Sequence, residues 1–206
     1  MISKIDEQQD DRARWNEKYQ AKGPEIFGRA PAPWLVMHQD ILLHQPRGPA
    51  LDVACGNGRN ARYLAGLGFE VEAVDISDVV IDWLQQRVEE WKLPIQPRCV
   101  DLTTASLPWK KYQVIANFLY LERRLFQALK DALLPGGLLF FETFTKDHLK
   151  RSGNYVNPIY ALEPNELLRA FADLRIIHYQ EMIVADEIHD RPNAVARLVA
   201  RKVSRG

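Results

Sequence analysis

The chain has 206 residues, which suits a single α/β domain with a modest N-terminal addition. Its hydrophobic fraction of 47% is enough for a full core, and its 27 basic residues balance its 27 acidic ones. Proteins that neutralise many phosphates usually carry a basic excess. The balance therefore argues against nucleic acid as a partner, although a local basic patch could still exist.

The sequence shows no pattern of a targeting signal or a metal site. Residues 1–15 are acidic and polar, without the apolar stretch of a signal peptide, and the densest apolar run, 138–141, is too short to span a membrane. We therefore expect a cytoplasmic protein without membrane contact, in which Cys55 and Cys99 are free thiols. Neither the cysteines nor the five histidines have metal-ligand spacing, so we predict no metal.

The N-terminal part of the chain has a helical and loop-like pattern. Residues 12–20 are expected to form a short helix that Gly23 ends, and the apolar stretch 34–43 is expected to form another. We predict that residues 1–49 are a helical extension and that residues 50–206 form one compact domain.

From residue 50 onward, strand patterns alternate with helix patterns. The expected strands are 50–53, 70–75, 95–100, 114–117 and 138–144, and the expected helices are 59–65, a helix capped by Ser77 that Pro94 ends, 123–134 and 165–171. Residues 145–163 look irregular. Two final strands, 174–180 and 194–201, have no helical pattern between them and are expected to pair antiparallel.

This order of elements predicts an α/β fold. We expect a Rossmann-like, doubly wound sheet of seven strands, mostly parallel with an antiparallel last strand, and helices on both faces. In such sheets, ligands bind outside the carboxyl ends of the strands, where the strand order reverses.

A loop of small residues follows the first predicted strand. Its members are Ala54, Cys55, Gly56, Asn57 and Gly58. Small residues allow a sharp turn and close approach of a ligand, and the next helix offers its N-terminal amides to an anion. From Gly56 onward the loop also fits the dinucleotide pattern G-x-G-x-x-A, so it is not specific by itself. Asp52 would repel a pyrophosphate but suits the ammonium of a methionine moiety; alternatively, it caps local amides.

Asp75 ends the second predicted strand, 19 residues after Gly56. That is close to the spacing of about 20 residues at which a carboxylate accepts both hydroxyls of a ribose. The alternative is a helix N-cap, which Ser77 could supply as well. Ile76, next to Asp75, is expected to contact the same ligand.

Asp101 and Leu102 follow the third predicted strand. The carboxylate can accept a hydrogen bond from an adenine amino group while the leucine packs on the ring. The alternative for Asp101 is an ordinary surface residue.

Together these features resemble the class I S-adenosylmethionine-dependent methyltransferases. The resemblance lies in Asp52–Gly58, Asp75, Asp101 and the turn Pro135–Gly137 before a strand, and it covers residues 50–144. It implies S-adenosylmethionine as the cofactor, and the closing hairpin fits that fold's antiparallel seventh strand. One departure is Ala54, where the family pattern D-x-G-x-G-x-G has its first glycine; alanine is tolerable there if its φ is negative.

Within that class, the sequence is similar to the tellurite-resistance and thiopurine-type small-molecule methyltransferases, in residues 15–19 and 58–60. In those enzymes the N-terminal segment folds over the cofactor. The resemblance implies that Trp15 and Tyr19 line a lid and that Arg59 meets the methionine carboxylate. The alternative for the aromatic pair is a helix face packed on the domain.

Two segments that the domain core does not need, residues 1–33 and 145–163, are expected to close over the cofactor.

The segment after the fourth predicted strand bears on the acceptor. Residues 117–120 lack the prolines of the family's N-P-P-Y motif, which disfavours methylation of amino groups by that arrangement. Asn117 is expected to contact the cofactor instead. The substrate-pocket candidates are Tyr120, Arg123, Glu142 and Tyr155. No His-carboxylate pair is evident, so the catalytic residue is left unassigned.

The predicted function is methyl transfer to a small-molecule acceptor, such as a thiol or a metalloid oxyanion. A nicotinamide-dependent oxidoreductase is the runner-up, favoured by the G-x-G-x-x-A pattern and disfavoured by Asp52 and the final hairpin. A non-catalytic cofactor-binding module is the third possibility. The sequence gives no indication of the oligomeric state.

Overall fold

A computed structural model describes residues 4–151, 158–185 and 192–203. The chain divides into two compact units, residues 1–106 and 107–206, and each is described separately. Among the described residues, no helix is both long enough and apolar enough to cross a membrane.

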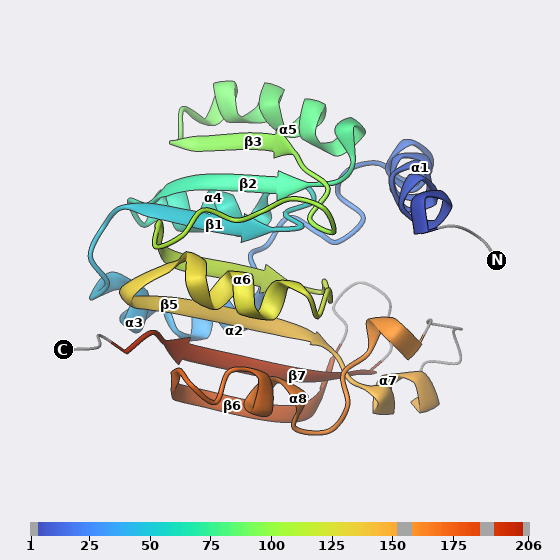
Figure 1. Cartoon of the computed structure of the whole chain (residues 1–206). Coiled ribbons are helices and arrows are strands. Elements are labelled where there is room, and N and C mark those ends of the chain that lie inside the picture. The colour runs from blue at the N-terminus through green and yellow to red at the C-terminus, as the bar shows by residue number, and fades with distance from the viewer. Residues whose placement is uncertain (1–3, 152–157, 186–191, 204–206) are drawn as a thin grey trace. The chain divides into compact units, whose positions relative to one another are not determined.

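Three helices precede the first strand. Helix α1 spans Lys4–Lys22, α2 spans Pro33–Met37 and α3 spans Gln39–Leu43 (Figure 1). The helix predicted at 12–20 is confirmed but begins earlier, because the polar residues before it favour helix without adding apolar periodicity. The predicted helix 34–43 is two short helices separated at His38. Trp34, Leu35 and Leu42 are fully buried, so this segment contributes apolar side chains to the protein core.

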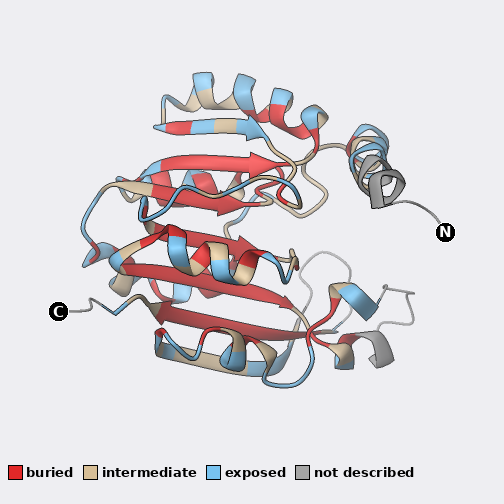
Figure 2. Ribbon diagram, in the orientation of Figure 1, coloured by how far each residue is buried: buried red, intermediate tan, exposed pale blue. Residues whose placement is uncertain are grey.

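The sheet of the first unit is parallel. Its strands are β1 (Pro49–Val53), β2 (Glu70–Asp75) and β3 (Ile95–Cys99), in the order β3-β2-β1. Strands β1 and β2 are buried almost throughout (Figure 2), as expected for parallel strands that are covered on both faces. Their carboxyl ends lie together, since Val53 is paired with Val74 and Asp75 with Cys99.

Helices α4 (Arg59–Gly66) and α5 (Asp78–Trp91) follow β1 and β2. The predicted cap of α5 is confirmed, because Ser77 Oγ accepts a hydrogen bond from the amide of Val80 at 3.3 Å. Leu84, on the inner face of α5, is fully buried. The helix ends at Trp91, where Lys92 takes a left-handed conformation with φ of 53°.

The second unit has a mixed sheet in the order β4-β5-β7-β6. Its elements are β4 (Tyr112–Phe118), α6 (Leu125–Ala132), β5 (Leu133–Phe144), α7 (Lys146–Arg151), the 3-10 turn η1 (Pro158–Tyr160), α8 (Glu166–Ala170), β6 (Arg175–Ala185) and β7 (Pro192–Arg201). Strand β5 is parallel to β4, whereas β7 is antiparallel to both β5 and β6. The predicted closing hairpin and reversed last strand are therefore confirmed.

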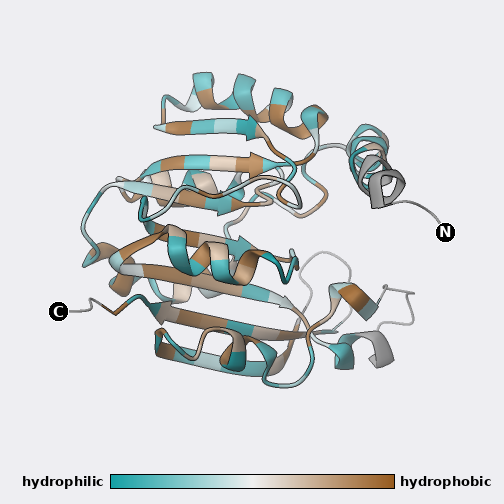
Figure 3. Ribbon diagram, viewed as in Figure 1, coloured by the Kyte–Doolittle hydropathy of each residue, from teal (hydrophilic) through white to brown (hydrophobic). Residues whose placement is uncertain are grey.

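Aromatic and aliphatic side chains fill the core of the second unit. The rings of Phe126 on α6, Phe141 on β5 and Phe171 after α8 lie 5.2–5.9 Å apart and pack both helices onto the sheet. Strand β5 carries mostly hydrophobic residues, whereas β6 also carries several hydrophilic ones (Figure 3). The prediction that residues 145–163 are irregular is wrong for Lys146–Arg151, which form helix α7. A helix of this length is too short to show a helical period in the sequence.

Candidate cofactor-binding site

The loop between β1 and α4 makes two left-handed turns at glycine. Gly56 has φ of 53° and Gly58 has φ of 71°, a region that side chains rarely adopt. A Cβ on Gly58 would lie 2.6 Å from Leu84 Cδ1, and a Cβ on Gly56 would lie 3.0 Å from Tyr19 Oη. Only glycine therefore meets both the backbone and the space requirements at these two positions.

Ala54 was expected to be tolerated in the loop only if its φ is negative. Its φ is 51°, in the left-handed region, so the expectation of a negative φ is wrong. The turn is imposed by the sheet, because the next amide, of Cys55, donates to Val74 O at 2.9 Å. A left-handed alanine costs about 1–2 kcal/mol relative to its ordinary conformation, and the surrounding hydrogen bonds hold it there.

Asp52 is buried on β1 beneath this loop. Its Oδ2 accepts the amide of Ala61, in the first turn of α4, at 2.9 Å, which is the local capping contact considered as the alternative. Burial raises the pKa of the Asp52 carboxyl to about 8, although the Ala61 amide and the charge of Arg59 oppose the shift. The carboxyl thus fixes the start of α4 relative to β1.

Asp75 joins the second strand to the glycine loop. Its Oδ2 accepts the amide of Gly56 at 2.9 Å, and its Oδ1 accepts the amide of Ser77 at 3.0 Å. Burial raises the pKa of Asp75, while the amides of Ser77, Gly56 and Ile76 oppose that shift. Each carboxylate oxygen can accept a second hydrogen bond. Gly56 and Asp75, which the sequence related only by their spacing of 19 residues, are therefore in direct contact.

Asp101 lies half-buried after β3, and Leu102 beside it is buried. Within the described residues, the Asp101 carboxylate accepts at Oδ1 from the amide and the hydroxyl of Thr103, at 2.9 and 2.6 Å. Oδ2 therefore keeps its capacity to accept from an exocyclic amino group.

Helix α1 contacts this same region. Tyr19 is buried with its hydroxyl against Gly56, and burial raises the pKa of that hydroxyl, with Asp75 and Cys55 adding to the shift. Asn16, which the sequence reasoning missed, accepts from Ser77 Oγ at 2.6 Å and donates to Asp78 Oδ1 at 2.6 Å.

The ring of Trp15 packs 5.9 Å from that of Tyr19 and 6.1 Å from that of Phe27, with the ammonium of Lys18 4.3 Å from the Trp15 ring. The aromatic pair therefore faces the folded unit, and the N-terminal segment is attached to the glycine loop.

Two loop residues hold the segment that follows α1. Asn57 Nδ2 donates to Gly28 O at 2.8 Å, and Arg59 Nη1 donates to Phe27 O and Ala30 O at 2.8 and 3.3 Å. The guanidinium of Arg59, which was predicted to meet the methionine carboxylate, thus donates to backbone carbonyls in this structure.

In the second unit, the turn after β4 is shaped by Asn117. Its side-chain amide donates to Tyr120 O at 2.8 Å, and Leu119 between them has a left-handed φ of 59°. Glu142 on β5 is buried, and its Oε2 accepts from Arg197 Nε on β7 at 2.6 Å. The two residues are directly paired across the strands, so Glu142 neutralises a buried guanidinium. Tyr155 lies outside the described residues.

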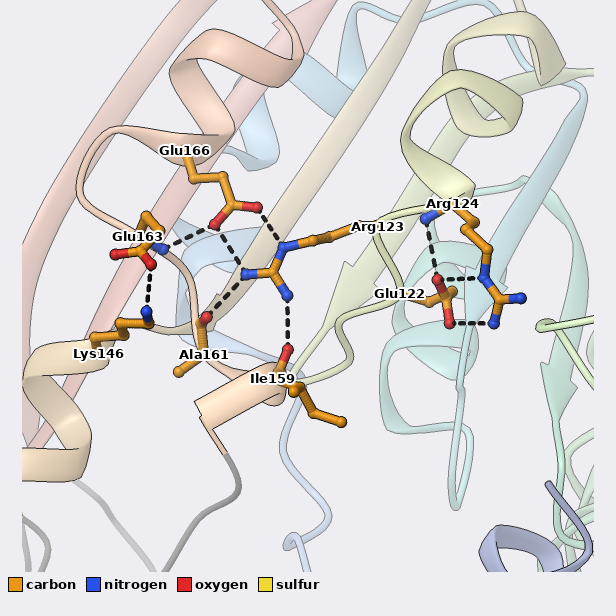
Figure 4. Close-up of polar contacts among 8 residues, drawn as sticks. All are labelled: Glu122, Arg123, Arg124, Lys146, Ile159, Ala161, Glu163 and Glu166. Atoms are coloured by element: carbon orange, nitrogen blue, oxygen red, sulfur yellow. Dashed lines mark hydrogen bonds and ion pairs between the residues drawn. The ribbon is translucent and has the colours of Figure 1, made fainter. Parts of the chain in front are cut away.

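Arg123, shortly after β4, organises a charged cluster (Figure 4). Its guanidinium makes two bonds to the carboxylate of Glu166, at 2.6 and 3.0 Å, and donates to Ile159 O and Ala161 O at 2.6 and 3.0 Å. Four of its five N–H groups are therefore used to fix residues 158–166.

A cavity of about 350 Å³ opens beside this cluster. Its lining is Arg123, Lys146, Pro158, Ile159, Glu163 and Glu166. Lys146, the first residue of α7, pairs with Glu163. Two partners of Arg123, Ile159 and Ala161, come from a segment that looked irregular in the sequence. Glu166 lies in the predicted helix 165–171, but no local pattern pairs it with Arg123.

The glycine loop and the acidic residues at the strand ends lie within a region that is similar to a known protein family. Residues 50–137 match a family model described as a methyltransferase domain. This part of the chain therefore resembles a methyltransferase domain. The match agrees with S-adenosylmethionine, the predicted cofactor, and disfavours the alternative of a nicotinamide-dependent oxidoreductase.

Curated relatives agree with the methyltransferase assignment. The chain is 30% identical over 102 residues to a ubiquinone biosynthesis O-methyltransferase of Coxiella burnetii, which covers 47% of this chain and 44% of that protein. It is 26% identical over 139 residues to the probable S-adenosyl-L-methionine-dependent methyltransferase TehB of Haemophilus influenzae, covering 64% and 47% of the two chains. The chain thus spans less than half the length of either relative.

Solved methyltransferase structures have the same fold. The structure of TehB from Haemophilus influenzae matches with a TM-score of 0.69 and 22% identity, covering 93% of this chain and 66% of that one. Geranyl diphosphate C-methyltransferase from Streptomyces coelicolor A3(2) matches with a TM-score of 0.66 and 15% identity, covering 95% and 98%. The predicted Rossmann-like fold with seven strands is therefore confirmed.

The residues near the glycine loop fit the predicted cofactor in chemical terms. Gly56 and Gly58 form a turn in which no side chain fits, and the carboxylates of Asp75 and Asp101 keep acceptor capacity. No group of three or more potential metal ligands lies together in the part of the chain that the structure describes. Cys55 is buried, which raises the pKa of its thiol well above the ordinary value and disfavours a nucleophilic role.

Proposed function

We propose that the protein transfers the methyl group of S-adenosylmethionine to a small-molecule acceptor. The observation that carries this proposal is the hydrogen bond from the Gly56 amide to Asp75, which joins the glycine loop to the acidic end of β2. Both residues fall within the matched methyltransferase domain. The alternative of a non-catalytic cofactor-binding module would share this geometry, so turnover must be part of the test.

The residues of the first unit take the following roles in the proposal. Asp75 accepts from the ribose hydroxyls with its remaining lone pairs, and Asp101 accepts from the adenine amino group while Leu102 packs on the ring. Asp52 supports the loop against which the methionine moiety lies. The bound cofactor supplies a sulfonium methyl group that a nucleophile can displace in line.

Positioning accounts for the proposed catalysis. The leaving group of a sulfonium is neutral and needs no proton, so holding the acceptor about 3–3.5 Å behind the methyl supplies most of the acceleration. A general base is required only for an acceptor that must lose a proton. A thiolate or a metalloid oxyanion needs none, which agrees with the absence of a convincing base among the assigned residues.

We propose the 350 Å³ cavity beside Arg123 as the acceptor pocket. It lies near the residues that follow β4 and β5, and in α/β sheets ligands bind at the carboxyl ends of strands. Its volume suits a small molecule, and the names of two proteins similar to this chain refer to ubiquinone biosynthesis and to geranyl diphosphate. Arg123 acts here as a positioning residue that holds the pocket wall.

Calorimetry with the full chain tests the proposal. S-adenosylhomocysteine should bind at least tenfold more tightly than NAD. Asp75→Ala should weaken that binding by about 1.5–3 kcal/mol, the value of hydrogen bonds to a charged group. Asp82→Ala, which removes an exposed carboxylate from the same region, is the matched control and should bind like the wild type.

Three outcomes would contradict the proposal. Tighter binding of NAD would refute the cofactor assignment, and an unchanged Kd in folded Asp75→Ala would restrict Asp75 to a structural role. Failure to form S-adenosylhomocysteine with a panel of thiols, metalloid oxyanions and phenols would favour the non-catalytic module.

A further inference from the structure

A second cavity, of about 250 Å³, lies in the first unit and has an unusual lining. Four arginines and two tryptophans contribute to it: Arg29, Arg59, Arg62, Arg87, Trp83 and Trp91. The three acidic residues assigned to the cofactor, Asp52, Asp75 and Asp101, are not part of this lining. The cavity therefore contains none of the carboxylates proposed to bind the cofactor, but it shares Asn57 and Arg59 with the predicted cofactor contacts.

The lining of this cavity is positively charged, whereas the whole chain has no net charge. The whole sequence balances 27 basic against 27 acidic residues. Among the described residues, Glu25 is the one acidic residue that lines the cavity, and it pairs with Arg29 at 2.7 Å on the exposed surface. Such an exposed pair contributes little and is screened by salt. The lining thus carries a formal excess of three positive charges, which favours an anionic occupant.

Aromatic rings hold two of the guanidiniums. Trp83, Arg87 and Trp91 recur every four residues on one face of α5. The guanidinium carbon of Arg62, on α4, lies 5.0 Å from the ring centroid of Trp91, and that of Arg87 lies 5.5 Å from the ring centroid of Trp83. Stacking fixes the plane of a guanidinium without using its N–H donors.

The N–H donors of Arg62 are the most available. In the described parts of the chain, the Arg62 guanidinium makes no hydrogen bond or ion pair with another side chain, and it lies over the ring of Trp91. Arg87 shares one Nη with Glu90 at 2.7 Å. A planar, preorganised guanidinium with open donors is the geometry that recognises phosphate through two parallel hydrogen bonds.

We propose that this cavity is a binding site for a small molecule with two or more phosphate groups. Several guanidiniums suit several phosphates, because each can make charge-assisted hydrogen bonds. The cavity is below the usual volume of a whole drug-sized ligand, so it accommodates the phosphate groups of a larger molecule or inorganic pyrophosphate itself. Asn57 and Arg59, which hold residues 27–30 to the glycine loop, also line it. Occupancy is therefore expected to change cofactor affinity, and the cofactor must change phosphate affinity by the same factor.

Calorimetric titration of the full chain with inorganic pyrophosphate and with ATP tests the site. Arg62→Gln/Arg87→Gln should weaken binding of either probe at least tenfold, as expected for lost charge-assisted hydrogen bonds. The matched control is Arg12→Gln/Arg169→Gln, which removes the same charge from exposed positions outside the cavity and should change binding less than twofold. S-adenosylhomocysteine should bind to both variants with a Kd within threefold of the wild type, so failure of the phosphate site and failure of the proposed function are distinguishable.

The relative affinities for pyrophosphate and ATP show whether the site recognises phosphate groups alone or a nucleotide. Equal affinity for the two probes supports recognition of the phosphates alone, and tighter binding of ATP supports a nucleotide. The proposal is overturned if neither probe binds at physiological salt, if both double variants lose affinity equally, or if saturating S-adenosylhomocysteine excludes pyrophosphate competitively. Tighter binding of a single-stranded oligonucleotide than of ATP would also overturn it, in favour of a nucleic-acid surface.

Discussion

Ala54 occupies a position where its side chain costs stability, and replacing it with glycine should strengthen the fold. The left-handed conformation at φ of 51° costs alanine about 1–2 kcal/mol. Glycine removes that cost but loses about 0.5–1 kcal/mol through the greater freedom of its unfolded chain. Ala54→Gly should therefore raise the free energy of unfolding by about 0.5–1 kcal/mol, the difference between the two terms.

Urea unfolding of the full chain measures this difference. The control is Ala13→Gly, an exposed alanine within α1, where the conformation is helical and glycine should destabilise by about 1 kcal/mol. Opposite signs for the two variants would confirm that the strain at residue 54 is real. Equal destabilisation by both would refute the reasoning, because the methyl group of Ala54 would then contribute more through packing than it costs in conformation.

The remaining predictions concern pH and closure. Because burial raises the pKa of Asp52 from 3.8 to about 8, the folded state holds this proton more tightly than the unfolded chain, and stability should fall as the pH rises from about 4 to about 8. Asp52→Asn should lose less stability than the wild type between pH 5 and pH 8 in urea unfolding; identical losses would mean that the folded carboxyl is ionised throughout. If residues 1–33 and 145–163 close over the cofactor, S-adenosylhomocysteine should slow amide hydrogen exchange in both segments. Protection confined to residues 52–60, 75 and 101 would restrict the ligand contacts to the strand ends.

The sequence by itself determined the order of the elements and the position of the glycine loop after the first strand. Apolar runs and helix caps are local signals, so the strand at 70–75 and the cap at Ser77 were predicted at their observed positions. The proximity of Gly56 and Asp75 was also predictable. The number of residues from the glycine loop to the end of the next parallel strand is nearly constant in this type of sheet.

Only the tertiary structure decided which partner each polar side chain takes. The backbone turn that forces Ala54 into a left-handed conformation depends on a hydrogen bond to the neighbouring strand, which no local pattern encodes. Glu142 is neutralised by Arg197 on β7, and the donors of Arg123 are used by residues far along the chain. The cavity between α4 and α5 collects arginines that are scattered through a neutral sequence. Side-chain partners and local charge depend on distance in space, and separation along the chain carries little information about that distance.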